Sequence, residues 1–244
     1  MGLLENTISG RTPRTSHAHV VDQLGRAIVA GDFAEGDLLP SDAALEARFQ
    51  VSRTVLREAM KTLSAKGLIV ARARIGTRVT ERTGWNLFDA DVLTWHFDAG
   101  ISEEFLVHVC EIRQAFEPFA AALAARRATP QDVQALRRLA EEIGRPTHSA
   151  ESLALADLRF HLALAEASKN PFMRSVSSLI EAALVGIFKL SSPAADPAKI
   201  AEVAGSHLAI VEAIARRDAE AARQAMEKVI LVGMERVKQA LARD

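Results

Sequence analysis

The chain has 244 residues, of which 30 are Lys or Arg and 31 are Asp or Glu, so its formal net charge is −1. Its apolar fraction of 49% and charged fraction of 25% are typical of globular proteins and exclude a disordered chain. No apolar run reaches the length of about 18 residues that a membrane span needs. The single cysteine, Cys110, excludes an internal disulfide framework and favours a reducing compartment, the cytoplasm. Residues 1–13 lack the pattern of a secretory signal and are expected to form a flexible arm.

The charge is unevenly distributed along the chain. Nine basic residues between Arg48 and Arg82 are opposed only by Glu58 and Glu81, so this stretch carries +7 and the remainder −8. A basic block in an otherwise acidic chain indicates a module with a polyanionic partner. A charge-rich helix surface exposed to solvent would give the same composition, so the local structure has to distinguish the two.

The first third of the chain predicts three helices and a hairpin. Residues 16–30 space their apolar side chains as a helix does. Ser41 and Ser52 can each cap a further helix, with a short turn between the two helices. Two β-rich stretches within residues 68–80 then predict a small hairpin. This order of elements is that of a winged helix-turn-helix, which we expect over residues 14–81.

The rest of the chain predicts a linker and a helical bundle. Residues 82–101 show no clear periodicity and are expected to connect two domains. Beyond them, residues 102–241 form about six Ala- and Leu-rich runs with helical spacing, which predicts an all-α bundle. The fold class is therefore mainly α, with an N-terminal winged helix-turn-helix followed by a C-terminal all-helical domain.

The start of the third helix carries the residues best suited to contact DNA. In a helix-turn-helix, the N-terminal residues of the recognition helix reach base edges in the major groove. Arg53 and Arg57 share one helix face, and each guanidinium can bind guanine bidentately. The hydroxyls of Ser52 and Thr54 suit phosphate oxygens. Hairpin arginines are expected along the backbone or in the minor groove: Arg72, Arg74 and Arg78. The alternative is that Arg57 and Glu58 take part in surface ion pairs.

The stretch GDLLPSDAALEARFQVSRTVLREAMKTLSAKGLIVARARIGTRV resembles the DNA-binding region of the GntR family of bacterial transcription regulators. The motifs that carry the resemblance are LPS, VSRTxLREAxxxLxxxGL and GTxV, and it extends over residues 14–80. The resemblance implies that Arg53 and Arg57 contact DNA. The chain departs from the family at Ala43, where a basic residue is common, and at Arg74, where a glycine is usual.

Three residues of the helical region could bind a metal ion. Asp157 and His161 are spaced i, i+4 and project from one face of a helix, while His207 begins another helix. One carboxylate and two imidazoles can hold a divalent cation and leave positions open. The alternative from spacing alone is that Asp157 is a surface charge and His161 a hydrogen-bonded core residue.

The pattern D-x-x-x-H, followed by A-S-x-N and later by H-x-x-I-x-x-A-I, is similar to the all-helical FCD effector domain of the FadR-type branch of the GntR family. The similarity covers residues 102–240. It implies a divalent metal, zinc or similar, held by an Asp and three His. Asp157, His161 and His207 match three of these positions, but Val229 replaces the fourth. The site would therefore bind metal more weakly, or bind an anion without metal.

Two further residues are candidates for the effector pocket. Arg113 and Glu117 are spaced i, i+4 and can form an ion pair within one helix. The resemblance, through EIRQAFEP, implies instead that Arg113 faces the pocket, where it could bind a carboxylate bidentately. Asn170 is expected first as an N-cap before Pro171, with a polar role in the pocket as the alternative.

The segment WNLFDADVLTW, from Trp85 to Trp95, resembles the segment that joins the domains in repressors of galactonate and related sugar-acid operons. This implies a sugar-acid effector, with hydroxyls bound by Asp157, His161 and His207 and its carboxylate by Arg113. The alternative is that the two tryptophans simply pack the junction between domains.

These observations predict a bacterial, cytoplasmic regulator without membrane partners that binds double-stranded operator DNA as a homodimer and associates with the nucleoid through that binding. We expect a repressor that is relieved by a sugar acid such as galactonate. One alternative is the same regulator with another effector: a hydroxy acid, an amino acid or a fatty acyl group. The other is a metal-dependent enzyme with a DNA-binding appendage, for which the sequence offers no clear general base.

Overall fold

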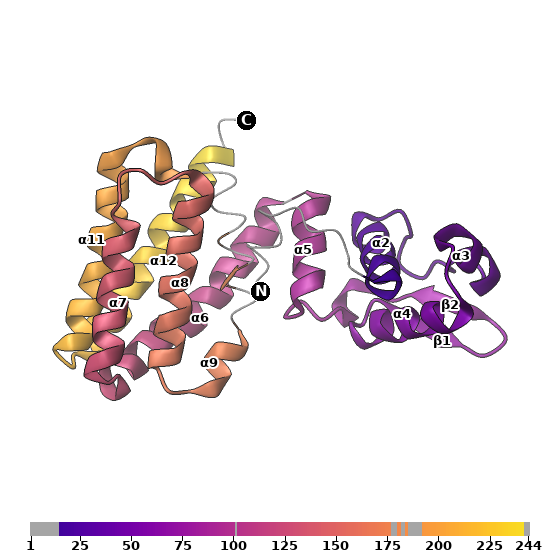
Figure 1. The fold of residues 1–244 in the computed structure, drawn as a ribbon, viewed down its shortest axis with the longest axis horizontal. Coiled ribbons are helices and arrows are strands. Elements are labelled where there is room, and N and C mark those ends of the chain that lie inside the picture. Colours follow the sequence, from indigo (N-terminus) through magenta and orange to yellow (C-terminus); the bar gives the residue numbers. More distant parts are fainter. Residues whose placement is uncertain (1–14, 101, 177–179, 182–183, 185–191, 242–244) are drawn as a thin grey trace. The chain divides into compact units, whose positions relative to one another are not determined.

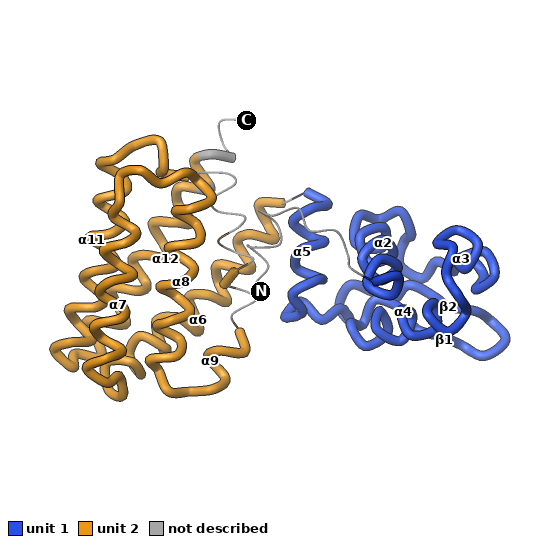
Figure 2. Tube along the Cα trace, viewed as in Figure 1, with its two compact units in different colours: residues 1, 9–101 blue, residues 2–8, 102–244 orange. Residues whose placement is uncertain are grey.

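The computed structural model describes residues 15–100, 102–176, 180–181, 184 and 192–241 (Figure 1). These residues divide into two compact units, an N-terminal unit up to residue 100 and a C-terminal unit from Ser102 (Figure 2). The helices within the described ranges are all too short or too polar to cross a membrane.

The N-terminal unit combines helices with one small sheet. Its elements are α2 (Ser16–Ala30), α3 (Asp42–Phe49), α4 (Arg53–Ala65), β1 (Ile69–Arg72), β2 (Gly76–Val79), the short 3₁₀ helix η1 (Arg82–Gly84) and α5 (Ala90–Ala99). The predicted caps are confirmed, because Ser41 accepts the amide of Ala44 and Ser52 that of Val55. Gln50 adopts a left-handed conformation (φ 53°) between α3 and α4, which makes the turn tight.

Strands β1 and β2 form the predicted hairpin, which is the wing of the motif. They pair antiparallel, with Ile69 opposite Val79 and Arg72 opposite Gly76. Arg74, in the turn, has a φ of 64°, the left-handed region that glycine adopts without cost. This conformation gives a physical reason for the glycine that is usual at this position in the family.

The core of the N-terminal unit gathers the apolar side chains of α2, α3, α4 and the wing. Its largest fully buried members are Leu24, Ile28, Leu45, Leu56, Leu63, Leu68 and Trp95. The structure differs here from the linker expected over residues 82–101. Helix α5 packs against α2, and Trp85, Val92 and Trp95 belong to the same core. The helix forms because Val92 and Trp95 lie on one face of a ten-residue segment that Asp89 caps.

The C-terminal unit is a bundle in which the described residues form helices and no strand. Its elements are α6 (Glu103–Arg127), α7 (Pro130–Ile143), α8 (Ala150–Ala167), α9 (Pro171–Ser175), the 3₁₀ helix η2 (Pro193–Ala195), α11 (Pro197–Ala215) and α12 (Ala219–Leu241). Thr129 and Ser149 form capping boxes at the predicted breaks. Helix α11 lies beside α7 and α12, and α12 lies beside α6 (Figure 1). Alanines at Ala121, Ala124 and Ala125 are fully buried, and their small side chains suit close contact between helices.

Candidate functional site

The start of α4 presents the predicted base-contacting arginines to solvent. Arg53 and Arg57 are exposed and take part in no ion pair with any described residue. The alternative of surface ion pairs is confirmed for Glu58, which binds Lys61 at 2.8 Å, but Arg57 has no such pair with a described residue. The Ser52 hydroxyl is used to cap the helix. Within the described part of the chain, the two guanidinium groups therefore have no salt-bridge partner.

The wing arginines differ from one another in their partners. Arg72 and Arg74 are exposed and, within the described ranges, form no ion pair. The Nη1 atom of Arg78 instead donates a hydrogen bond of 2.5 Å to the carbonyl of Gly36. This bond ties β2 to the connector between α2 and α3, so Arg78 has a structural partner that the other two lack.

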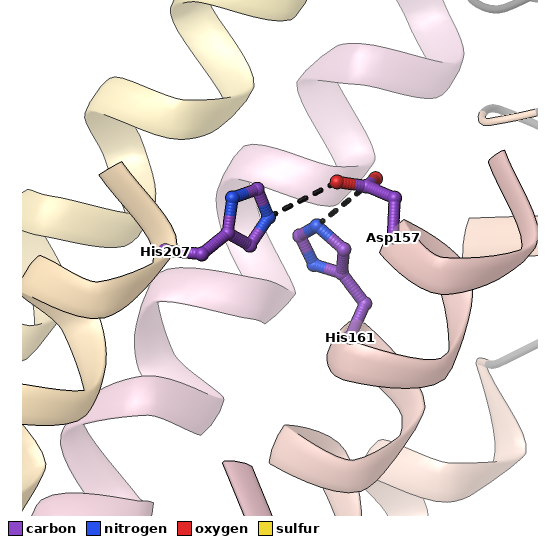
Figure 3. A group of neighbouring side chains, drawn as sticks. All are labelled: Asp157, His161 and His207. Atoms are coloured by element: carbon purple, nitrogen blue, oxygen red, sulfur yellow. Dashed lines mark ion pairs between the residues drawn. The ribbon is translucent and has the colours of Figure 1, made fainter. Parts of the chain in front are cut away.

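The predicted metal ligands come together in the C-terminal unit. Asp157 and His161 extend from α8 and His207 from α11, and one ligand atom of each lies within 4.8 Å of the others (Figure 3). The Nε2 atom of His207 is 3.1 Å from Asp157 Oδ1, and the Nε2 atom of His161 is 3.6 Å from Asp157 Oδ2. All three side chains are buried, none more than 6% exposed. The reading of Asp157 as a surface charge is wrong, because Asp157 is buried. The reading of His161 as a core residue matches its burial and the distance of 2.5 Å between its Nδ1 and Glu117 Oε2.

The protonation of His207 is fixed by its backbone partner. Its Nδ1 lies 2.8 Å from the carbonyl oxygen of Val203 and must donate to it, which leaves the lone pair of Nε2 directed at Asp157 in the neutral ring. His161 Nε2 and His207 Nε2 have no partner in hydrogen-bond geometry among the described residues. Buried polar atoms without partners are costly, and a cation placed between the three side chains would satisfy them. The donor set therefore fits a divalent metal.

Glu117 on α6 joins this cluster, although the sequence suggested it only as a partner of Arg113. Its Oε1 lies 2.5 Å from Arg113 Nε and its Oε2 lies 2.5 Å from His161 Nδ1. Burial raises the pKa of Glu117, but the charges of Arg113 and His161 outweigh it and lower the pKa to about 2. The ion pair expected from the spacing of Arg113 and Glu117 is confirmed, and it compensates the charge of Arg113.

A cavity of about 340 Å³ opens beside the cluster. Arg113, Asp157, His161 and His207 line it, and so does Val229, at the position of the missing histidine. Asn170 is not among the lining residues. Its side chain accepts the amide of Phe172 and caps α9, as expected first.

Arg236 is one of the cavity residues that sequence reasoning missed. It lines the cavity from α12, and its buried Nε has no hydrogen-bond partner among the described residues. Burial lowers its pKa, while Asp157 and Glu202 raise it, and the balance lies below the usual range. The signal available in the sequence was its spacing of seven residues from Val229, which places both on one helix face.

The sequence comparisons agree with this architecture. Residues 17–79 match the family described as bacterial regulatory proteins, gntR family, and residues 108–231 match the FCD domain. The chain belongs to the GntR family. It is a regulator of the FadR type, with a winged helix-turn-helix followed by an all-helical FCD domain, and its relatives are transcriptional regulators rather than enzymes.

Two curated relatives cover most of the chain. The galactonate operon transcriptional repressor of Escherichia coli (strain K12) is 31% identical over 90% of this chain and 96% of its own length. The transcriptional repressor NanR of Cronobacter sakazakii is 30% identical over 85% of this chain and 80% of its own length. Among solved structures, Lar of Listeria monocytogenes superimposes with a TM-score of 0.64 at 21% identity, covering 94% of this chain and 99% of that one. The similarity to the Listeria structure shows a shared fold and nothing about function.

Proposed function

We propose that this GntR regulator is a repressor whose operator binding is relieved by a small carboxylate, with a sugar acid such as galactonate as the first candidate. The observation that carries the proposal is one cavity lined both by a metal-type cluster and by Arg236, whose buried Nε has no hydrogen-bond partner among the described residues. A polyhydroxylated acid offers oxygens for the first and a carboxylate for the second. The 31% identity to a galactonate operon repressor supports the same choice.

Asp157, His161 and His207 would hold the divalent metal, zinc or similar. When bound, such an ion supplies a positive charge that attracts hydroxyl or carboxylate oxygens. Val229 offers no ligand atom, so one position that a histidine fills in relatives remains for an effector oxygen. Glu117 orients His161 from the far side of the ring, as the outer partners of metal-bound histidines do.

The carboxylate of the effector is assigned to Arg236 rather than to Arg113 alone. Glu117 already compensates the charge of Arg113 at 2.5 Å. Arg236 brings a buried Nε–H that needs an acceptor, and a guanidinium can bind a carboxylate through two parallel hydrogen bonds. A carboxylate in the cavity would satisfy this donor, while Arg113 fixes the cluster through Glu117.

DNA binding is assigned to the exposed arginines of α4 and the wing, namely Arg53, Arg57, Arg72 and Arg74. A homodimer would place two copies of α4 in successive major grooves of a near-palindromic operator. The effector relieves repression when it binds more tightly to an arrangement of the units that separates the two helices from their half-sites.

A thermal-shift panel of organic acids tests this function. The purified chain is heated with D-galactonate, related sugar acids, hydroxy acids, amino acids or fatty acids, each with zinc and with a chelator. The proposal predicts the largest stabilisation by a sugar acid with zinc. Stabilisation only by a hydroxy acid, an amino acid or a fatty acid would move the assignment to that class. Stabilisation that survives chelation would show that the metal is not required.

A further inference from the structure

Helix α5 is attached to the C-terminal end of α4 by a charge cluster that the proposed function does not use. We propose that α4 and α5 move as one body, that Lys66 and Asp89 are the joint between them, and that the hinge toward the C-terminal unit lies at Gly100. The rigid connection between α4 and α5 is inferred from geometry alone. Its role in transmitting an effector signal to the operator rests on the proposed function.

Lys66 occupies the C-cap of α4, and its side chain is only 11% exposed. Its Nζ donates to both carboxylate oxygens of Asp89, at 2.7 and 2.8 Å, and lies 2.8 Å from Asp91 Oδ2. The same ammonium group lies 5.8 Å from the centre of the Trp95 ring. Burial lowers the pKa of Lys66, but Asp89 and Asp91 outweigh it and raise the pKa above its ordinary value, so the group stays charged.

Asp89 serves both helices at once. Its Oδ1 accepts the amides of Asp91 and Val92, which makes Asp89 the N-cap of α5. The same carboxylate binds Lys66 at the end of α4. The backbone adds a further link, because the carbonyl of Lys66 accepts the amide of Asn86. A displacement of α5 relative to α4 would therefore separate Lys66 from the carboxylate that caps α5 and break a partly buried ion pair.

The other face of α5 is fixed to α2. The indole Nε1 of Trp95 donates to Asp22 Oδ1 at 3.0 Å. The Trp95 ring rests directly on Gly25, where an added Cβ would lie 2.3 Å from a ring carbon. Contacts this close leave α5 no freedom to slide along α2.

We place the hinge at Gly100, which directly follows α5. It ends α5 with a φ of 111°, a conformation that L side chains rarely adopt, and a Cβ added there would meet no atom within 4 Å. A rotation at Gly100 would carry α5 and, through the Lys66–Asp89 pair, α4 with it. Lys66 and Asp89 are thus positioning residues for the DNA-contacting arginines, through which an effector signal reaches the operator.

Hydrogen exchange of the full-length chain tests the joint directly. In the wild type we expect the amides of α4 and α5 to exchange through a common opening with similar protection. Asp89→Asn keeps a good capping residue but removes the charge, and Lys66→Met keeps the apolar stem. Both should speed exchange of α5 relative to α4 by about tenfold. The matched control is Asp98→Asn, which removes the exposed Arg26–Asp98 pair on the same helix and should change exchange by less than about threefold. Faster exchange of α5 than of α4 in the wild type would contradict the proposal that the two helices move as one body. Equal effects of the Asp89 and Asp98 variants would contradict it as well.

Operator binding, with D-galactonate as the probe, tests whether the Lys66–Asp89 pair carries the effector signal to α4. For Asp89→Asn we expect the loss of operator affinity that the acid causes, measured as the ratio of the variant's own Kd values with and without the acid, to shrink toward none. An undiminished response in that variant would contradict the role of the joint. A wild type that ignores the acid would refute the effector assignment, while the exchange measurement would still decide whether α4 and α5 move together.

Discussion

The Nε2 atom of His207 and the Oδ1 atom of Asp157 face each other at 3.1 Å from two different helices of the bundle. Because the Nδ1 atom of His207 donates to Val203, both facing atoms are hydrogen-bond acceptors when the imidazole is neutral. Two acceptors at this distance repel unless a proton or a metal ion lies between them. The carboxyl of Asp157 favours its charged form there, since the two histidines lower its pKa against the effect of burial.

Zinc should therefore stabilise the chain, and His207→Ala should abolish the effect. At a zinc concentration of 100 times Kd, linkage gives a gain of about 2.7 kcal/mol, which a thermal melt resolves easily. Addition of a chelator should reverse the gain. His108→Ala is the matched control, because His108 is exposed on α6 and lies outside the cluster. Zinc stabilisation that persists in the His207 variant would rule out the assigned ligands.

Arg236→Gln should remove the stabilisation that an acid effector provides while leaving that of zinc in place. The substitution deletes the buried guanidinium that lacks a partner, and lost hydrogen bonds to a charged group cost about 1.5–3 kcal/mol each. Lys228→Gln removes an exposed positive charge from the same helix and serves as the control. If both variants respond to the acid as the wild type does, the carboxylate binds elsewhere.

Arg53→Ala should weaken operator binding by about 1–3 kcal/mol and relax the preference for one base pair. Fluorescence anisotropy with operator variants measures both effects. Arg138→Ala, an exposed charge on α7 in the other unit, should change neither. If the Arg53→Ala protein binds the operator and its variants with the affinities of the wild type, Arg53 does not contact DNA.

Gly25→Ala and Gly205→Ala should change stability in opposite directions. The Cβ at residue 25 would enter the Trp95 ring, and overpacking of this kind costs about 1–3 kcal/mol. At residue 205 a Cβ meets nothing within 4 Å in the middle of α11, so the better helix former should add about 0.5–1 kcal/mol. Denaturant unfolding measures both. A neutral Gly25→Ala would show that α5 is not packed on α2 as described.

Local chemistry explains why much of the fold was predictable. Helix caps such as Ser41 and Ser52 are decided by a side chain and an amide three residues away, and the hairpin by a few β-rich residues around a turn. Asp157 and His161 could be paired from their spacing on one helix. His207 could be grouped with them as a possible third ligand, and the resemblance to a family supported the grouping, since spacing cannot show which helices are neighbours.

The missed features depend on contacts between distant segments. Helix α5 has only ten residues and gains its stability from packing on α2, so residues 82–101 gave no strong periodic signal of their own. Glu117 was visible as the partner of Arg113, but its contact with His161 requires α6 and α8 to be adjacent. Arg236 stands out only after α12 closes the cavity and leaves its Nε without an acceptor.

Operator binding measured with and without the acid tests the central claim most directly. An operator selected from random DNA by the purified chain is labelled, and anisotropy gives its Kd in zinc alone and in zinc with D-galactonate. A coupling between the two sites of ordinary size predicts that the acid weakens binding about 5- to 150-fold, and that Arg236→Gln abolishes the change. Equal affinities with and without the acid, in a wild type that binds the operator sequence-specifically, would contradict the account.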